Sequence, residues 1–229
     1  MNLRFISLTG ADDRTTVQEI ELLSEKYPLF ECAILIFPEA HSINRNPSLG
    51  WRKYLYKSSV KNKAIHLCGT SIDQFAVQDK AIMQDIENVG RVQINLQPRW
   101  ASENLYEKLV KAVQKNSHIE FITQHNEQNQ PYLHYWENVA NHGYLFDGSL
   151  GKGICPEKWI SPVNDKSCGY AGGLSPDNII ENLSKIFAVV NDKPFWIDME
   201  TGVRTSNKFD LKKCDDVLSK STDWYKNII

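Results

Sequence analysis

Short apolar runs alternate with stretches of helical spacing along the whole chain, and this alternation limits the folds open to it. The runs are rich in β-branched and aromatic residues, which is typical of buried strands. They lie at residues 4–10, 30–37, 63–69, 91–97, 119–125, 143–148, 167–173 and 194–200. The stretches between them, such as 15–27, repeat apolar residues at intervals of three and four, as amphipathic helices do. This order predicts right-handed βαβ crossovers and a parallel sheet.

Eight strand and helix units in 229 residues match the size of a (βα)8 TIM barrel, which is the α/β fold that we expect. A doubly wound open sheet is the alternative, but it usually has fewer strands, and no G-x-G-x-x-G motif follows the first strand. No linker or charge block divides the chain, so residues 1–229 are expected to form one domain. Ser71, Ser102 and Ser175 are the expected starts of three of the helices.

Charge and cysteine content exclude several classes of function. The formal net charge of -2 gives no basic field, so nucleic acid is not an expected partner. We expect a cytoplasmic protein without a membrane partner, because the chain shows neither a signal peptide nor an apolar stretch of about 18 residues. The five cysteines are odd in number and lack CxxC spacing, so neither a disulfide framework nor a zinc site is predicted. The sequence does not indicate an oligomeric state.

The segment GYAGGLSPDN, residues 169–178, stands where the seventh strand gives way to a helix. Gly172 and Gly173 allow bare backbone amides to approach an anion, and a helix that begins near Ser175 would direct the positive end of its dipole to the same place. Barrels of this kind often bind phosphate after strands seven and eight. The segment therefore predicts a phosphate site, with a tight strand-to-helix turn as the alternative.

Together with IDMETGVR at 197–204 and NKFDLKK at 207–213, this segment resembles the C-terminal part of the phosphoribosylanthranilate isomerases. The resemblance is strong over residues 143–215 and is mostly one of strand order in the first half. It implies a cofactor-free Amadori rearrangement of a small phosphorylated substrate. In that reaction a general acid opens the ring of a phosphorylated aminosugar, and a general base removes a proton from the neighbouring carbon.

The resemblance also implies roles for individual residues. Asp147, in GYLFDGSLGKG at 143–153, matches the acid, and its pKa would have to be raised for it to donate a proton at neutral pH. Arg45 matches an arginine that binds a substrate carboxylate. The other implied contacts are substrate binding by Gln93, Asn95 and Asp198, and phosphate binding by Gly172, Gly173, Thr201 and Gly202.

The chain departs from the family at the base, because Thr9 stands where the family has a cysteine. A threonine hydroxyl is not a free base near neutral pH, so Cys68, which ends the third strand, is an alternative catalytic residue. Asp12 and Asp13 are further alternatives. A second departure is a glutamate, residue 200, in place of a serine beside the expected phosphate site; its charge would repel phosphate unless Arg204 neutralises it.

Three classes of function therefore stay open. The first is a sugar-phosphate isomerase that uses the residues named above. The second is a barrel that kept the phosphate site but changed its chemistry, with His66 or His125 as proton carriers beside Asp147 or Asp198. The third is a non-catalytic protein that binds a phosphorylated metabolite or another protein. A metal site is not expected, because no HxH or HExxH spacing occurs.

Overall fold

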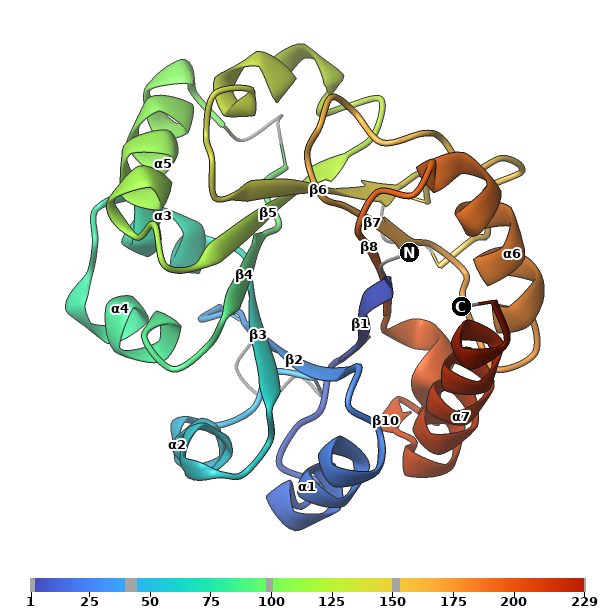
Figure 1. Ribbon diagram of the computed structural model, residues 1–229. Helices are drawn as coiled ribbons and strands as arrows, with labels where there is room; N and C mark the ends of the chain where they lie inside the picture. Colours follow the sequence, from blue (N-terminus) through green and yellow to red (C-terminus); the bar gives the residue numbers. More distant parts are fainter. Residues whose placement is uncertain (1–2, 40–44, 98–100, 150–152, 229) are drawn as a thin grey trace.

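Eight parallel strands close into a barrel, with helices around its outside (Figure 1). The computed structural model describes residues 3–39, 45–97, 101–149 and 153–228. Each strand pairs with the next along the chain, and the first pairs with the last, so the (βα)8 barrel predicted from the sequence is confirmed. The strands are β1 (Leu3–Thr9), β2 (Phe30–Ile36), β3 (Asn62–Leu67), β4 (Arg91–Ile94), β5 (Glu120–His125), β6 (His142–Asp147), β7 (Cys168–Ala171) and β8 (Phe195–Met199).

Seven α-helices occur in the described part of the chain, and they occupy most of the connections between strands. They are α1 (Val17–Lys26), α2 (Leu49–Lys57), α3 (Thr70–Ala76), α4 (Lys80–Ile86), α5 (Glu103–Lys115), α6 (Ile179–Val190) and α7 (Leu211–Ile228). A 3-10 helix, η2 (Gln130–Trp136), connects β5 to β6, and residues 153–167 before β7 form no helix. None of the helices described is long and apolar enough to cross a membrane.

Of the three predicted helix starts, Ser102 is confirmed, α3 begins one residue before Ser71, and α6 begins four residues after Ser175. Ser102 does cap α5, since its side chain accepts a hydrogen bond from the amide of Leu105. Ser71 instead lies inside α3, where its hydroxyl donates to the carbonyl of Ile36, and a new cap at Asp79 starts α4 as a separate helix. The helix expected near Ser175 is α6, which begins only at Ile179.

The barrel is filled at its N-terminal end by an indole and a buried arginine. The ring of Trp196 on β8 occupies the place of a side chain on β7, because a Cβ added to Gly169 would lie 2.1 Å from the indole. Arg91 lies over this ring at 4.2 Å and pairs with Glu31 at 2.7 Å and with Glu120 at 3.1 Å. Residues at this end stabilise the barrel, which leaves the opposite end for a binding site.

Candidate active site

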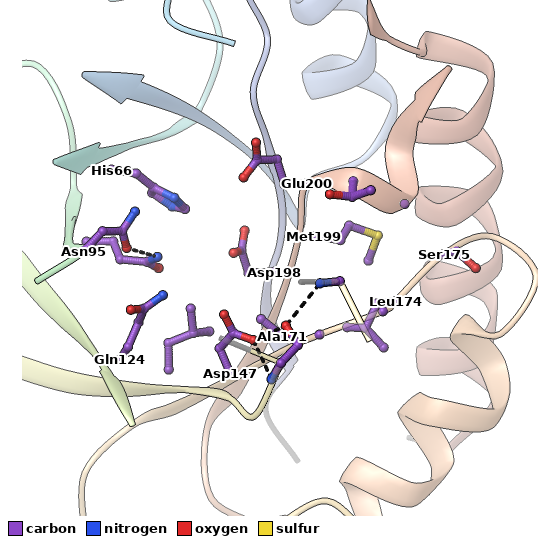
Figure 2. A pocket seen from close by; sticks show the side chains of 18 residues that line it. His66, Asn95, Gln124, Asp147, Ala171, Leu174, Ser175, Asp198, Met199 and Glu200 are labelled. Carbon is purple, nitrogen blue, oxygen red and sulfur yellow. Dashed lines mark hydrogen bonds between the residues drawn. The ribbon is translucent and has the colours of Figure 1, made fainter. Parts of the chain in front are cut away.

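A cavity of about 340 Å³ lies among the C-terminal ends of β3 to β8 and the loops that follow β6, β7 and β8. Figure 2 shows polar side chains from several strands directed into this space, with Asp198 near its centre. Eight of the eleven site residues expected from the sequence line the cavity. These are Gln93, Asn95, Asp147, Gly172, Gly173, Asp198, Thr201 and Gly202.

Two carboxyl groups, those of Asp147 and Asp198, enter the cavity from the same level of the barrel. Asp147 pairs in register with Ala171 of β7, which in turn pairs with Asp198 of β8. Adjacent strands lie about 4.8 Å apart, so the backbones of the two aspartates are separated by about 10 Å. The two carboxyl groups can therefore contact one small ligand from two sides.

The environment of Asp198 disfavours its charged form. The side chain is 8% exposed, and its Oδ1 accepts a hydrogen bond of 2.7 Å from the hydroxyl of Thr9. Burial raises the pKa of Asp198 from 3.8 to about 7; the hydrogen bond from Thr9 opposes this rise, while the charges of Glu200 and Asp147 add to it. A carboxyl group that titrates near neutral pH can exchange a proton with a ligand.

Asp147 is held by the start of the loop that follows β6. Its Oδ1 accepts hydrogen bonds from the amide of Ser149 at 3.1 Å and from the hydroxyl of Ser149 at 2.6 Å. The same hydroxyl oxygen accepts a hydrogen bond from the amide of Gly153. Ser149 therefore fixes the carboxyl group of Asp147 and contacts Gly153, the next described residue of the loop. Residues 150–152, which belong to the segment GYLFDGSLGKG that resembles the isomerases, lie outside the described part of the chain.

Gly172 and Gly173, here called the glycine turn, line the cavity, and the loops that follow β6 and β8 both pack against this turn. Gly172 and Gly173 have positive φ angles of 117° and 62°, and a Cβ at Gly173 would lie 2.2 Å from the amide nitrogen of Cys155. Asn178 fixes the turn by donating to the carbonyl of Gly173 and accepting from the amide of Ser175. No described residue accepts a hydrogen bond from the amides of Gly172 and Gly173.

The loop that follows β8 also packs against the glycine turn. A Cβ at Gly202 would lie 1.9 Å from the carbonyl oxygen of Leu174, so only glycine allows this contact between the two backbones. Gly202 lies in the short 3-10 helix η3 (Thr201–Val203), whose first amides have no acceptor within the helix. The sequence predicted that a helix beginning at Ser175 would direct its dipole at this turn. That helix is α6, and it begins four residues later, at Ile179.

The remaining three expected residues, Thr9, Cys68 and Arg45, do not line the cavity. Thr9 lies behind Asp198 and donates to it. Cys68 accepts a hydrogen bond from Asn95, and burial raises the pKa of its thiol to about 11, so the thiolate is scarce at neutral pH. The expectation that Cys68 supplies a base is therefore not favoured by its surroundings.

Arg45 and Glu200 form an ion pair at the edge of the cavity. Their side chains form an ion pair of 2.5 Å, and the guanidinium of Arg45 also donates to the side chain of Asn207. The sequence suggested Arg204 as the partner of Glu200, but Arg204 donates to the carbonyl of Gly10. Glu200 itself lines the cavity, and its ion pair with Arg45 compensates part of its charge there.

The two candidate histidines are not equivalent. His66 lines the cavity, and burial lowers its pKa to about 4, so the ring is neutral near pH 7. His125 instead lines a separate cavity beside Phe146 and Trp159. In the described ranges no three His, Cys, Asp or Glu side chains are grouped so that they could hold a metal ion.

Gln124 and Ser149 line the cavity but were not identified from the sequence. Gln124 is the next-to-last residue of β5 and pairs in register with Leu145. A polar residue at the C-terminal end of a barrel strand is the signal that could have identified it. Ser149 gave no comparable signal, because its role depends on the conformation of the loop.

Two solved structures resemble this one over almost its whole length. N-(5'-phosphoribosyl)anthranilate isomerase from Pyrococcus furiosus superposes with a TM-score of 0.60 and 13% identity, covering 96% of this chain and 98% of its own. Phosphoribosyl anthranilate isomerase from Thermococcus kodakaraensis gives a TM-score of 0.57 and 13% identity, covering 96% and 99%. No protein-family model and no curated protein matches the sequence. Identity this low shows a shared fold.

Proposed function

We propose that this barrel catalyses the acid–base isomerisation of a small phosphorylated sugar derivative, of the Amadori type. The observation that carries the proposal is the pair of carboxyl groups, Asp147 and Asp198, that enter one cavity beside the backbone amides of a glycine turn. An isomerisation of this type moves protons between neighbouring atoms of the substrate, and two carboxyl groups on opposite sides of a sugar can donate and accept them.

The phosphate of the substrate would bind at the glycine turn. Gly172, Gly173, Thr201 and Gly202 line that side of the cavity, and amides without an acceptor are the groups that recognise phosphate in loops of this kind. The ion pair with Arg45 compensates part of the charge of Glu200, which still acts on Asp198, so it reduces the repulsion of a phosphate without removing it. Gln93, Asn95 and Gln124 supply amide groups for the sugar hydroxyls.

The substrate named for the two similar structures, phosphoribosylanthranilate, is the first to test on this chain. Arg45, the residue expected to bind a substrate carboxylate, is already occupied by Glu200 and Asn207. A carboxylate ligand would have to replace Glu200 at this guanidinium. The ligands tested should therefore include sugar phosphates with and without an aromatic carboxylate.

Thermal unfolding in the presence of these ligands tests the proposal. A ligand at 100 times its Kd adds about 2.7 kcal/mol to the free energy of unfolding, which raises the Tm by roughly 5 to 10 °C for a chain of this size. We expect such a rise with a sugar phosphate or a reduced product analogue, well above that with inorganic phosphate. If no phosphate ester changes the Tm, the proposal is wrong; a rise without turnover would indicate a binding protein.

A further inference from the structure

A second cavity, of about 300 Å³, lies between the loops that follow β5 and β6. Successive residues of a strand face opposite sides of a sheet. Gln124 and Leu145 line the candidate active site, whereas His125 and Phe146, the next residues of the same strands, line this second cavity. It therefore lies on the outer side of the barrel wall, and we call it the outer cavity. Its volume is at the lower end of the range for small-molecule sites.

Two buried aromatic side chains, Phe146 and Trp159, form walls of the outer cavity. Both rings pack against the ring of Tyr170, with centroids 5.3 and 5.7 Å away. The indole of Trp159 donates a hydrogen bond of 3.0 Å to the side chain of Asn182, and the hydroxyl of Tyr170 donates one to the carbonyl of Ile160. The polar atoms of these rings are thus already bonded, so the walls present fixed aromatic surfaces to a ligand.

The buried polar group of the outer cavity is the side chain of His125. It is 8% exposed, and neither of its ring nitrogens has a hydrogen-bond partner in the described part of the chain. His142, which is also buried, has its Nε2 bonded to the hydroxyl of Thr123 at 2.8 Å. Buried polar groups in proteins are nearly always hydrogen-bonded. An unpaired histidine in the wall of a cavity therefore indicates a ligand that supplies the missing partner.

The surroundings of His125 also indicate which partner is missing. Burial lowers the pKa of His125, so at neutral pH its ring is uncharged and carries one hydrogen. Nδ1 is enclosed by the protein without an acceptor, and a buried N–H without an acceptor is rare. The hydrogen therefore belongs on Nε2, which is not enclosed, and the missing partner is an acceptor such as an oxygen.

The charges around the outer cavity favour a neutral ligand. Glu127 and Lys158 line the cavity, both are exposed, and their charges are opposite, so together they give no preference for an ionised ligand. A carboxylate that accepted from His125 would lose its hydration beside an uncharged ring, which is unfavourable. An uncharged carbonyl oxygen can accept the same hydrogen bond at a lower cost in desolvation.

The outer cavity shares the loop after β6 with the candidate active site. Gly148 lines the outer cavity, and its neighbours Asp147 and Ser149 line the active site. Pro156, which also lines the outer cavity, lies beside the glycine turn, since a Cβ at Gly172 would be 3.7 Å from its Cδ. A ligand in the outer cavity would therefore contact this loop from its other side.

We propose that the outer cavity is a second ligand site, for a small planar aromatic compound with an uncharged carbonyl oxygen. The ring lies against Phe146 and Trp159, in the offset or edge-to-face arrangement that aromatic rings prefer, and the oxygen accepts a hydrogen bond from Nε2 of His125. This inference does not depend on the isomerase function proposed above, because the described residues that line the two cavities are different.

An NMR titration with benzamide tests the proposal on the wild-type protein. Benzamide has a planar ring and an uncharged carbonyl oxygen. We expect it to bind with a Kd on the order of 1 mM, as is reasonable for a ligand of its size. Nuclear Overhauser contacts should join its ring protons to Phe146 and Trp159. An absence of binding at ten times this concentration, or contacts with His66 of the active site instead, would overturn the proposal.

Two related compounds test the class of ligand. Cyclohexanecarboxamide keeps the amide without the planar ring, and benzoate replaces the amide by a carboxylate. Each should bind at least about threefold more weakly than benzamide, because the first loses the contacts between aromatic rings and the second loses its hydration. Equal or tighter binding of either compound would overturn the class that we propose.

The variant His125→Phe tests the hydrogen bond, because phenylalanine keeps a ring at this position and removes the donor. We expect its affinity for benzamide to fall by about 2- to 12-fold, the effect of one hydrogen bond. His118→Phe, at an exposed position before β5, is a matched control and should leave the Kd unchanged. An unchanged Kd in His125→Phe would overturn the inference. Neither experiment measures turnover, so the failure of this inference and the failure of the proposed function are distinguishable.

Discussion

Replacing Asp198 by asparagine should stabilise the protein at alkaline pH. In the folded chain this group stays protonated up to about pH 7, whereas in the unfolded chain it ionises near its ordinary value of 3.8. A folded-state pKa that is raised contributes stability below the unfolded value, and this contribution is lost as the pH rises through the folded value. Asparagine has no proton to lose, and its amide oxygen can still accept the hydrogen bond from Thr9.

The size of the effect follows from the pKa. Each pKa unit corresponds to about 1.4 kcal/mol, so the change from 3.8 to about 7 amounts to roughly 4 kcal/mol. Asp198 is 8% exposed, so solvent screening reduces this little. The free energy of unfolding of Asp198→Asn should equal that of the wild type to within about 1 kcal/mol at pH 4. At pH 8 it should exceed the wild-type value by about 4 kcal/mol, which corresponds to a Tm that is roughly 8 to 16 °C higher.

Urea unfolding of the two proteins between pH 4 and pH 9 measures this difference. Asp223→Asn, an exposed position on α7, is a matched control and should show no such dependence on pH. A difference between Asp198→Asn and the wild type that does not grow between pH 4 and pH 8 would refute the reasoning, as would an Asp198→Asn protein that is less stable at pH 8.

Three further predictions concern other parts of the barrel. Arg91→Met should cost about 3 to 5 kcal/mol in urea unfolding because it leaves Glu31 buried and unpaired, and adding Glu31→Met should recover much of the loss. Gly202→Ala should cost about 1 to 3 kcal/mol and abolish the rise in Tm with sugar phosphates, because the new Cβ meets the carbonyl of Leu174. When the pH falls from 6.5 to 4, the free energy of unfolding of the wild type should decrease by about 3 kcal/mol relative to that of His66→Asn. The reason is that His66 is protonated in the unfolded chain but not in the folded chain over this range. An unchanged unfolding curve would contradict each expectation.

The eight strands could be predicted because each one is buried, and burial selects apolar β-branched residues in short runs. The level at which Asp147 and Asp198 enter the cavity also follows from their place at strand ends. The hydrogen bond from Thr9 to Asp198 could not be predicted, because it joins the first and last strands through the register of barrel closure.

Contacts between loops were equally hidden in the sequence. The pairing of Arg45 with Glu200 joins the loop after β2 to the loop after β8, and no local pattern marks it. The glycine turn was recognised as special, yet the contact of Gly202 with the carbonyl of Leu174 depends on how two loops approach each other. Local spacing specifies elements, whereas such contacts depend on the distance between elements in the folded chain.

Conversion of phosphoribosylanthranilate to its ketose isomer, followed by NMR, tests the central claim most directly. The assay should compare the wild type with Asp147→Asn, with Asp198→Asn and with the Asp223→Asn control. The account predicts turnover by the wild type and the control, and a loss of at least about 100-fold in each of the other two variants. Equal rates in all four proteins, or no conversion of this or any related sugar phosphate by the wild type, would contradict it.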